Sequence, residues 1–151
     1  MNSLSSATLH RLTELHDSIR QVLDALPSEA LDWSPAPDVN SVAVLVTHIS
    51  GSERYWIGEK VGGQAANRNR DAEFTVREIC ANDLKTLLDA GIEMATAVLQ
   101  ELEYEDLARP AGVSREGFTY DTAWALQHAL EHVAVHTGHV ELMRQWWENR
   151  A

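Results

Sequence analysis

Residues 121–148 read DTAWALQHALEHVAVHTGHVELMRQWWE. Asp121 or Thr122 can cap a helix that runs from there to about Glu148. Four of the chain's seven histidines lie in it: His128, His132, His136 and His139. At ~100° per residue the four fall within an arc of ~80°, on the face that continues through Leu142, Met143 and Trp146. This pattern predicts a long amphipathic helix whose core-facing row carries imidazoles.

Three more segments have apolar residues at alternating steps of three and four, which is typical of helices packed on a core. The first covers residues 7–26 and ends at Pro27. The second begins at residue 40 or 41 and ends at Gly62 and Gly63, and the third covers residues 82–102. Strand signals are almost absent. We therefore predict an all-α fold, an antiparallel-type four-helix bundle that forms a single domain over residues 1–151.

Two long connections, residues 64–81 and 103–121, leave the order of the helices open, because either can be a crossover. Residues 64–81 lack a sustained period, and we expect them to cross one end of the bundle, with a short helical turn near residues 75–80. Gly91 and Ala95 in the third helix predict a close helix contact.

Composition restricts the partners of this chain. It has 12 Lys and Arg against 23 Asp and Glu, a formal net charge of −11, which disfavours nucleic acid. No apolar run approaches the about 18 residues that span a bilayer, so no membrane association is expected. Cys80 is the single cysteine, and the first ten residues lack the features of a secretory signal. We expect a cytoplasmic protein.

The row of histidines on the last helix suggests metal binding, because histidines at i and i+4 lie one above the other and can share an ion. His132 and His136 have this spacing, as do His128 and His132. A further ligand has to come from another helix: His48 lies in the second, and His10 and His16 lie in the first. Three histidines without a fourth protein ligand leave a coordination position for water or substrate.

The alternative interpretation is a set of hydrogen-bonded histidines without a metal. It is the favoured one for His10, His16 or His128 alone, because an isolated histidine on an apolar face is more often a satisfied core residue. For His132 with His136, the spacing leaves the two interpretations evenly balanced.

A family resemblance adds to this pattern. Residues 41–56, SVAVLVTHISGSERYW, preceded by Trp33-Ser34-Pro35-Ala36-Pro37, resemble the DinB-like (DinB/YfiT) superfamily. The last helix also matches that family's pattern of a histidine, three residues, a second histidine, one residue, glycine and a polar residue. The matching positions are His132, His136, Gly138 and His139. The common Arg-Gly-Gln ending is replaced by Thr137-Gly138-His139, which leaves open whether residue 139 is a ligand, supports one or only packs.

The resemblance implies a four-helix bundle, often a homodimer, with a divalent metal, zinc or nickel, held by His48, His132 and His136. Characterised relatives include bacillithiol S-transferases and the mycothiol-dependent maleylpyruvate isomerase, and others are described as metal-dependent hydrolases. The first expectation is therefore a metal-dependent enzyme that transfers a low-molecular-weight thiol, as cosubstrate, to a small electrophilic substrate.

Two other functions stay open. A hydrolase would use the same ion to activate water, although no residue stands out as its general base. A non-catalytic metal-binding bundle would close the site with a fourth ligand such as His128 or His139. A zincin is excluded because Val133, not glutamate, follows His132, and a di-iron bundle is excluded because Glu-x-x-His does not occur.

Overall fold

The computed structural model describes residues 1–150 and is mostly helical, with one small antiparallel sheet. Four long helical segments contain most of the chain. They are α1 (Ser3–Ala25), α3 (Val42–Glu53) continued by the π-helical stretch η1 (Arg54–Val61), α5 (Ala81–Glu101) and α6 (Thr122–Glu148). The shorter elements are α2 (Ser28–Leu31), α4 (Arg70–Glu73), the 3-10 helix η2 (Tyr104–Ala108), β1 (Pro110–Val113) and β2 (Thr119–Asp121).

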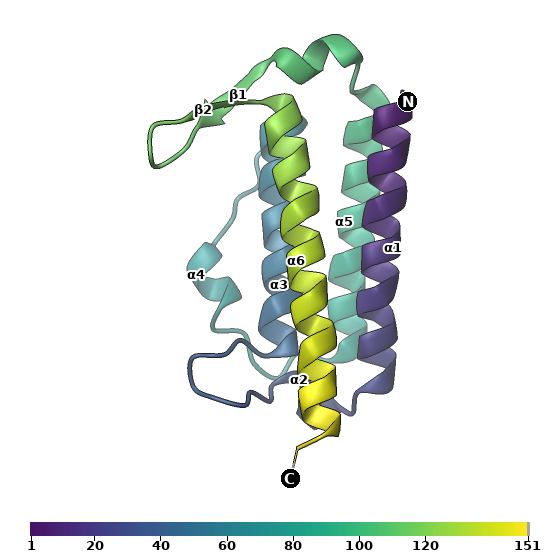
Figure 1. The fold of residues 1–151 in the computed structure, drawn as a ribbon, viewed down its shortest axis with the longest axis vertical. Helices are drawn as coiled ribbons and strands as arrows, with labels where there is room; N and C mark the ends of the chain where they lie inside the picture. The colour runs from purple at the N-terminus through teal and green to yellow at the C-terminus, as the bar shows by residue number, and fades with distance from the viewer. Residues whose placement is uncertain (151) are drawn as a thin grey trace.

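The long helices lie side by side around one core (Figure 1). Contacts between α1 and α5 join Asn2 to Leu102 and Arg20 to Asp89, so these two helices are antiparallel. In contrast, α3 with η1 runs parallel to α5. The segment 64–81 is therefore the crossover that the sequence left open, and Figure 1 shows it descending beside α3 rather than crossing one end. The helical turn of this segment is α4 (Arg70–Glu73), whereas the sequence predicted it near residues 75–80.

Helix ends follow the local capping chemistry. Asp121 accepts a hydrogen bond from the backbone of Trp124 and caps α6, and Ser41 does the same for α3 through Val44. The first helix begins earlier than predicted, at Ser3, because the Asn2 side chain accepts from the Ser5 backbone and is its cap. None of the helices within residues 1–150 combines the length and the apolar character of a membrane crossing.

The predicted imidazole row is not the core-facing row of α6. The buried row consists of small and apolar residues, with two threonines: Thr122, Ala125, Leu126, Ala129, Val133, Thr137, Val140 and Met143. His128, His132 and His136 are half-buried on the adjoining stripe, while His139, Leu142 and Trp146 are exposed. The histidines thus line the edge of the core, where a polar ring retains access to solvent or to a ligand.

Gly91 marks the predicted close helix contact. A Cβ there would lie 3.0 Å from Glu53 Oε2 and 3.3 Å from His16 Cε1. These two side chains form a buried pair, in which His16 Nε2 lies 2.9 Å from Glu53 Oε1 and His16 Nδ1 donates to the Leu88 carbonyl at 3.2 Å. His16 is therefore a hydrogen-bonded core residue, as favoured from the sequence, whereas His10 is exposed.

The antiparallel hairpin of β1 and β2 corrects the expectation of an all-helical chain. Its strands are too short to show an alternating pattern in the sequence. Gly112 on β1 packs directly on the buried Tyr120 ring of β2, where a Cβ would lie 2.7 Å from Cζ of the ring. Gly117 takes a positive φ of 84° in the turn. The hairpin extends beside the first turns of α6 (Figure 1).

Candidate metal centre

Three of the seven histidines converge on one point between α3 and α6. His48, His132 and His136 each offer a ring nitrogen, and these nitrogens all lie within 4.8 Å of one another. The Nε2 atoms of His48 and His132 are 3.0 Å apart. Ring centroids are separated by 5.1 Å for His48 and His136 and by 4.4 Å for His132 and His136. The i, i+4 pair on α6 and the histidine of α3 therefore meet, as the family resemblance implied.

His48 is held by a buried carboxylate. Its Nδ1 donates to Glu73 Oε2 at 2.8 Å, and Glu73 in turn accepts from Arg68, Nε to Oε1 at 2.7 Å and Nη2 to Oε2 at 2.8 Å. Burial acts to raise the pKa of Glu73, but the hydrogen bonds from Arg68 and His48 outweigh it and lower that pKa. Because the ionised carboxylate only accepts, Nδ1 of His48 carries the proton and Nε2 keeps its lone pair toward the other two histidines.

Gly51 makes room for this carboxylate. It lies on α3 one turn beyond His48, and a Cβ at this position would overlap the carboxylate of Glu73, lying 2.6 Å from Cδ. The missing side chain thus allows Glu73, from the end of α4, to reach the ring of His48. The glycine of the His-Ile-Ser-Gly segment has a structural role beside the histidine.

On α6, His139 supports the triad without joining it. Its Nδ1 lies 3.2 Å from Nδ1 of His136, while the ring itself is exposed. A hydrogen bond in which His136 Nδ1 donates to His139 Nδ1 leaves the lone pair of His136 Nε2 available. Within residues 1–150, the converging nitrogens come only from His48, His132 and His136.

The three rings resist protonation. Burial, together with the neighbouring His136 and His48, lowers the pKa of His132 from 6.5 to about 3. Burial and the adjacent His48 and His139 lower the pKa of His136 to about 4. Burial also lowers the pKa of His48, although Glu73 opposes the shift. All three imidazoles are therefore neutral near pH 7, which is the form that binds metal.

These shifts predict how the stability of the metal-free protein depends on pH. Below pH 6.5 the unfolded chain takes up protons at His132 and His136 that the folded chain excludes, so the free energy of unfolding falls as the pH is lowered toward 4. Urea denaturation after chelation should give a lower midpoint at pH 5 than at pH 7.5. The His132→Gln, His136→Gln double variant should lose part of this difference, and His10→Gln should keep it. Equal pH dependence in all three proteins would contradict the prediction.

The donor set fits a divalent metal. A tetrahedral ion with bonds of 2.0–2.1 Å places its ligand nitrogens about 3.3 Å apart, close to the separation of His48 and His132. His132 Nδ1 is buried without a hydrogen-bond partner in the described part of the chain. This atom is not the Nε2 that faces His48, so the fit of a metal rests on the converging nitrogens and not on Nδ1. Three neutral imidazoles suit zinc or nickel.

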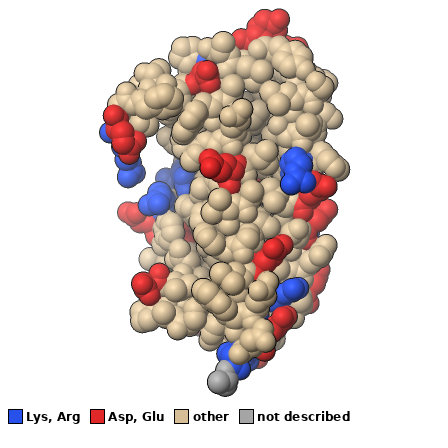
Figure 2. Space-filling model, in the orientation of Figure 1, with Lys and Arg blue, Asp and Glu red and all other residues tan. Residues whose placement is uncertain are grey.

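Two histidines of the triad, His48 and His132, line a cleft of about 570 Å³. Aromatic side chains from η1, β2 and α6 line it, namely Tyr55, Trp56, Tyr120 and Trp124. His128 is part of this wall: its ring stacks on Trp124 with centroids 4.9 Å apart and lies 6.3 Å from His132. On the surface the cleft is the hollow below the hairpin, with Lys and Arg side chains beside it (Figure 2). His128 therefore lines the cleft rather than completing the triad.

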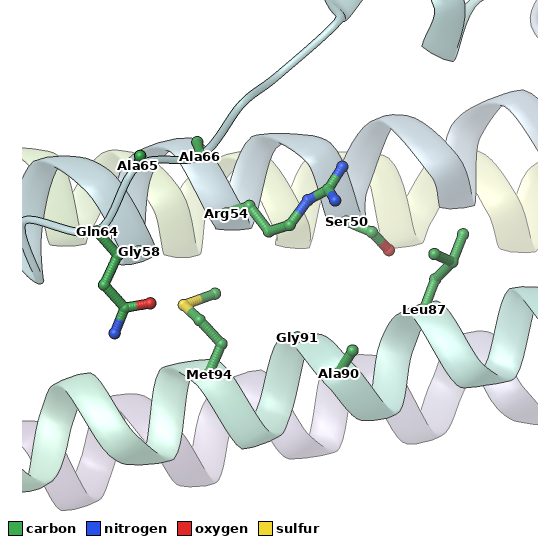
Figure 3. A pocket seen from close by; sticks show the side chains of 10 residues that line it. All are labelled: Ser50, Arg54, Gly58, Gln64, Ala65, Ala66, Leu87, Ala90, Gly91 and Met94. Atoms are coloured by element: carbon green, nitrogen blue, oxygen red, sulfur yellow. The ribbon is translucent and has the colours of Figure 1, made fainter.

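A second, smaller cavity of about 170 Å³ lies on the other side of α3 and η1. Figure 3 shows Ser50 and Arg54 facing Met94 and Leu87 of α5 across this space. No histidine lines it. The cleft with the histidines is therefore the candidate site.

Sequence reasoning missed two residues of the centre, Glu73 and Arg68. Both lie in the segment 64–81, which has no periodic pattern, and Glu73 is 25 positions from His48. No signal in the sequence distinguishes Glu73, because Asp71 and Glu78 lie in the same segment. Their contacts with His48 depend on the crossover passing beside α3.

Comparison with known proteins gives the family. The family model described as protein of unknown function DUF1572 matches residues 2–150. No curated protein matches the chain.

Several solved structures share the fold. A DinB-like protein from Bacillus subtilis superposes with a TM-score of 0.71 at 19% identity, covering 96% of this chain and 94% of that one. A conserved protein from Enterococcus faecalis gives 0.77 at 16%, covering 96% and 97%. The mycothiol-dependent maleylpyruvate isomerase gives 0.64 at 12%, covering 88% of this chain but only 59% of the enzyme.

At these identities the likeness concerns the fold. A fourth structure, of a protein assigned to the DinB family from Exiguobacterium sibiricum, covers all of this chain with a TM-score of 0.72 at 14% identity. The DinB-like neighbours agree with the resemblance seen in the residues around His48 and His132. The chain belongs to the DUF1572 family.

Proposed function

We propose that this protein is a metal-dependent enzyme that transfers a low-molecular-weight thiol to a small electrophilic substrate. His48, His132 and His136 hold the divalent metal, zinc or nickel. The observation that carries the proposal is the convergence of three neutral imidazoles, without a fourth protein ligand in residues 1–150, at the wall of an open cleft. Thiol use is supported by the shared fold of the mycothiol-dependent isomerase.

The metal would supply one property, a lowered pKa of the thiol that keeps the sulfur as thiolate. The sulfur provides the electron pair of the new carbon–sulfur bond, and its proton passes to solvent. The substrate either releases a leaving group with the electron pair of the broken bond or takes up a proton.

The chain's own residues prepare the site. Glu73 fixes the tautomer and the orientation of His48, and Arg68 keeps Glu73 ionised. Trp56 and Trp124 pack around His128 and form an apolar wall beside the triad, which excludes water from that side. Such a wall suits a reaction in which water would compete with the thiol.

The hydrolase remains the second candidate, but the structure offers no separate general base beside the triad. Glu73 already accepts from Arg68 and His48, and Glu116 lies exposed on the hairpin at the rim of the cleft. A closed, non-catalytic site is less favoured, since His128 and His139 lie outside the group of converging nitrogens.

The experiment is a comparison of turnover with and without thiol. Zinc- or nickel-loaded protein should accelerate the conjugation of a general electrophile such as monochlorobimane when cysteine, glutathione, bacillithiol or mycothiol is supplied in turn. His132→Ala should abolish the acceleration and His10→Ala should retain it. Turnover of esters or amides without thiol would instead support the hydrolase and refute the transfer.

A further inference from the structure

The cleft beside the histidine triad has a charge opposite to that of the whole protein. The chain carries a net charge of −11, yet the cleft is lined by Arg68, Arg70 and Arg115 and by one exposed acid, Glu116. Figure 2 shows a group of basic side chains at the hollow below the hairpin, with acidic side chains beside them and over the rest of the visible face.

Two of these arginines form no ion pair among residues 1–150. Arg68 is bound to Glu73, but Arg70 and Arg115 have no carboxylate within 4.0 Å among residues 1–150. In contrast, Arg20 pairs with Asp17 and Asp89, and Arg109 pairs with Asp106. The cleft thus contains free guanidinium groups in an acidic protein that pairs several of its other arginines.

The two free groups come from opposite walls. Arg70 lies on α4, with its guanidinium carbon 5.0 Å from the centroid of Phe74, and that ring is 4.8 Å from the ring of His48. Arg115 lies in the hairpin turn between β1 and β2. A ligand that enters the cleft therefore passes between two cations, with the aromatic rings of Trp56 and Trp124 on its way to the triad.

We infer that the cleft binds a small organic carboxylate, held by Arg70 and Arg115 through charge-assisted hydrogen bonds, with its apolar part against the aromatic wall. Guanidinium groups match the geometry of a carboxylate, and the partly enclosed cleft strengthens such bonds. The inference rests on the proposed function, since it identifies the substrate class of that site. The carboxylate can belong to the electrophile or to the thiol cosubstrate.

The test uses metal-free, full-length protein, so that no ion can hold the anion. Phenylsuccinate, which has two carboxylates and a ring, is titrated by calorimetry, and its neutral diamide is the comparison ligand. Phenylsuccinate should bind and the diamide should not. Arg70→Gln and Arg115→Gln should each weaken binding about tenfold, the size expected for a lost hydrogen bond to a charged group. Arg77→Gln, which changes an exposed arginine outside the cleft, should bind as wild type does.

Three results would overturn the inference: no binding of phenylsuccinate to wild type, equal binding of the diamide, or unchanged binding by the Arg70→Gln, Arg115→Gln double variant. Zinc-loaded protein then shows whether the bound carboxylate belongs to the thiol cosubstrate or to the electrophile. If zinc strengthens binding of mercaptosuccinate but not of succinate, the carboxylate belongs to the thiol; if it strengthens neither, the carboxylate belongs to the electrophile. Because the arginine test needs no metal, failure of the metal proposal would be seen separately.

Discussion

Replacing His132 by alanine should abolish stoichiometric zinc or nickel binding while leaving the protein folded. His132 is central to the triad, with its Nε2 3.0 Å from that of His48 and its ring 4.4 Å from that of His136. Loss of an outer-shell partner of a metal ligand weakens metal affinity by up to about 100-fold. Loss of one of the three ligands themselves should weaken it more. Metal content after dialysis against a weak chelator, with circular dichroism for the fold, measures the effect. His48→Ala and His136→Ala should behave alike.

His10→Ala is the matched control. His10 lies exposed on α1 and its only ionic neighbour is Glu14, 3.4 Å away, so metal binding should be unaffected. If the three triad variants retained metal as well as this control does, the ligand assignment would be wrong. A folded wild-type protein that takes up neither zinc nor nickel would refute both metal-dependent mechanisms.

Gly51→Ala adds only one methyl group, but it should both destabilise the fold and weaken metal binding. The new Cβ would overlap the Glu73 carboxylate, which must leave its place beside His48 and Arg68. Losing these charge-assisted hydrogen bonds should cost about 1–3 kcal/mol of unfolding free energy, more than the gain in helix propensity. Metal affinity should fall by about 10- to 100-fold, because His48 loses the acceptor that orients it. Urea denaturation and a competitive metal titration measure the two effects.

Gly138→Ala is the control for this change. Gly138 is also a helical glycine, but a Cβ there would meet nothing within 4 Å, so the variant should be stabilised by up to about 1 kcal/mol. The Gly51→Ala, Glu73→Ala double variant gives a second check. With the carboxylate removed, adding the methyl group should cost no further metal affinity; an additive loss would show that Gly51 acts in another way.

The sequence indicated the pair on the last helix through local spacing, and the family resemblance added His48 as the third ligand candidate. His132 and His136 are one turn apart on a strongly periodic helix, and His48 is the only histidine of the second helix. The prediction that the histidines of the last helix form its core-facing row was wrong. Periodicity gives the angle between residues on a helix, but it does not say which side of the helix contacts its neighbours. Ala125, Ala129 and Val133 take that position, and the histidines lie beside it.

The sequence by itself determined the long helices and most of their ends, because capping residues, prolines and apolar periodicity act over a few residues. It thereby also placed the histidines on these helices. Only the tertiary structure decided that segment 64–81 descends beside α3, that Glu73 enters the space left by Gly51, and that Arg70 and Arg115 line the same cleft. Each of these depends on the path of a segment without periodicity. Contacts between residues such as His48 and Glu73, 25 positions apart, are set by that path and not by local propensity.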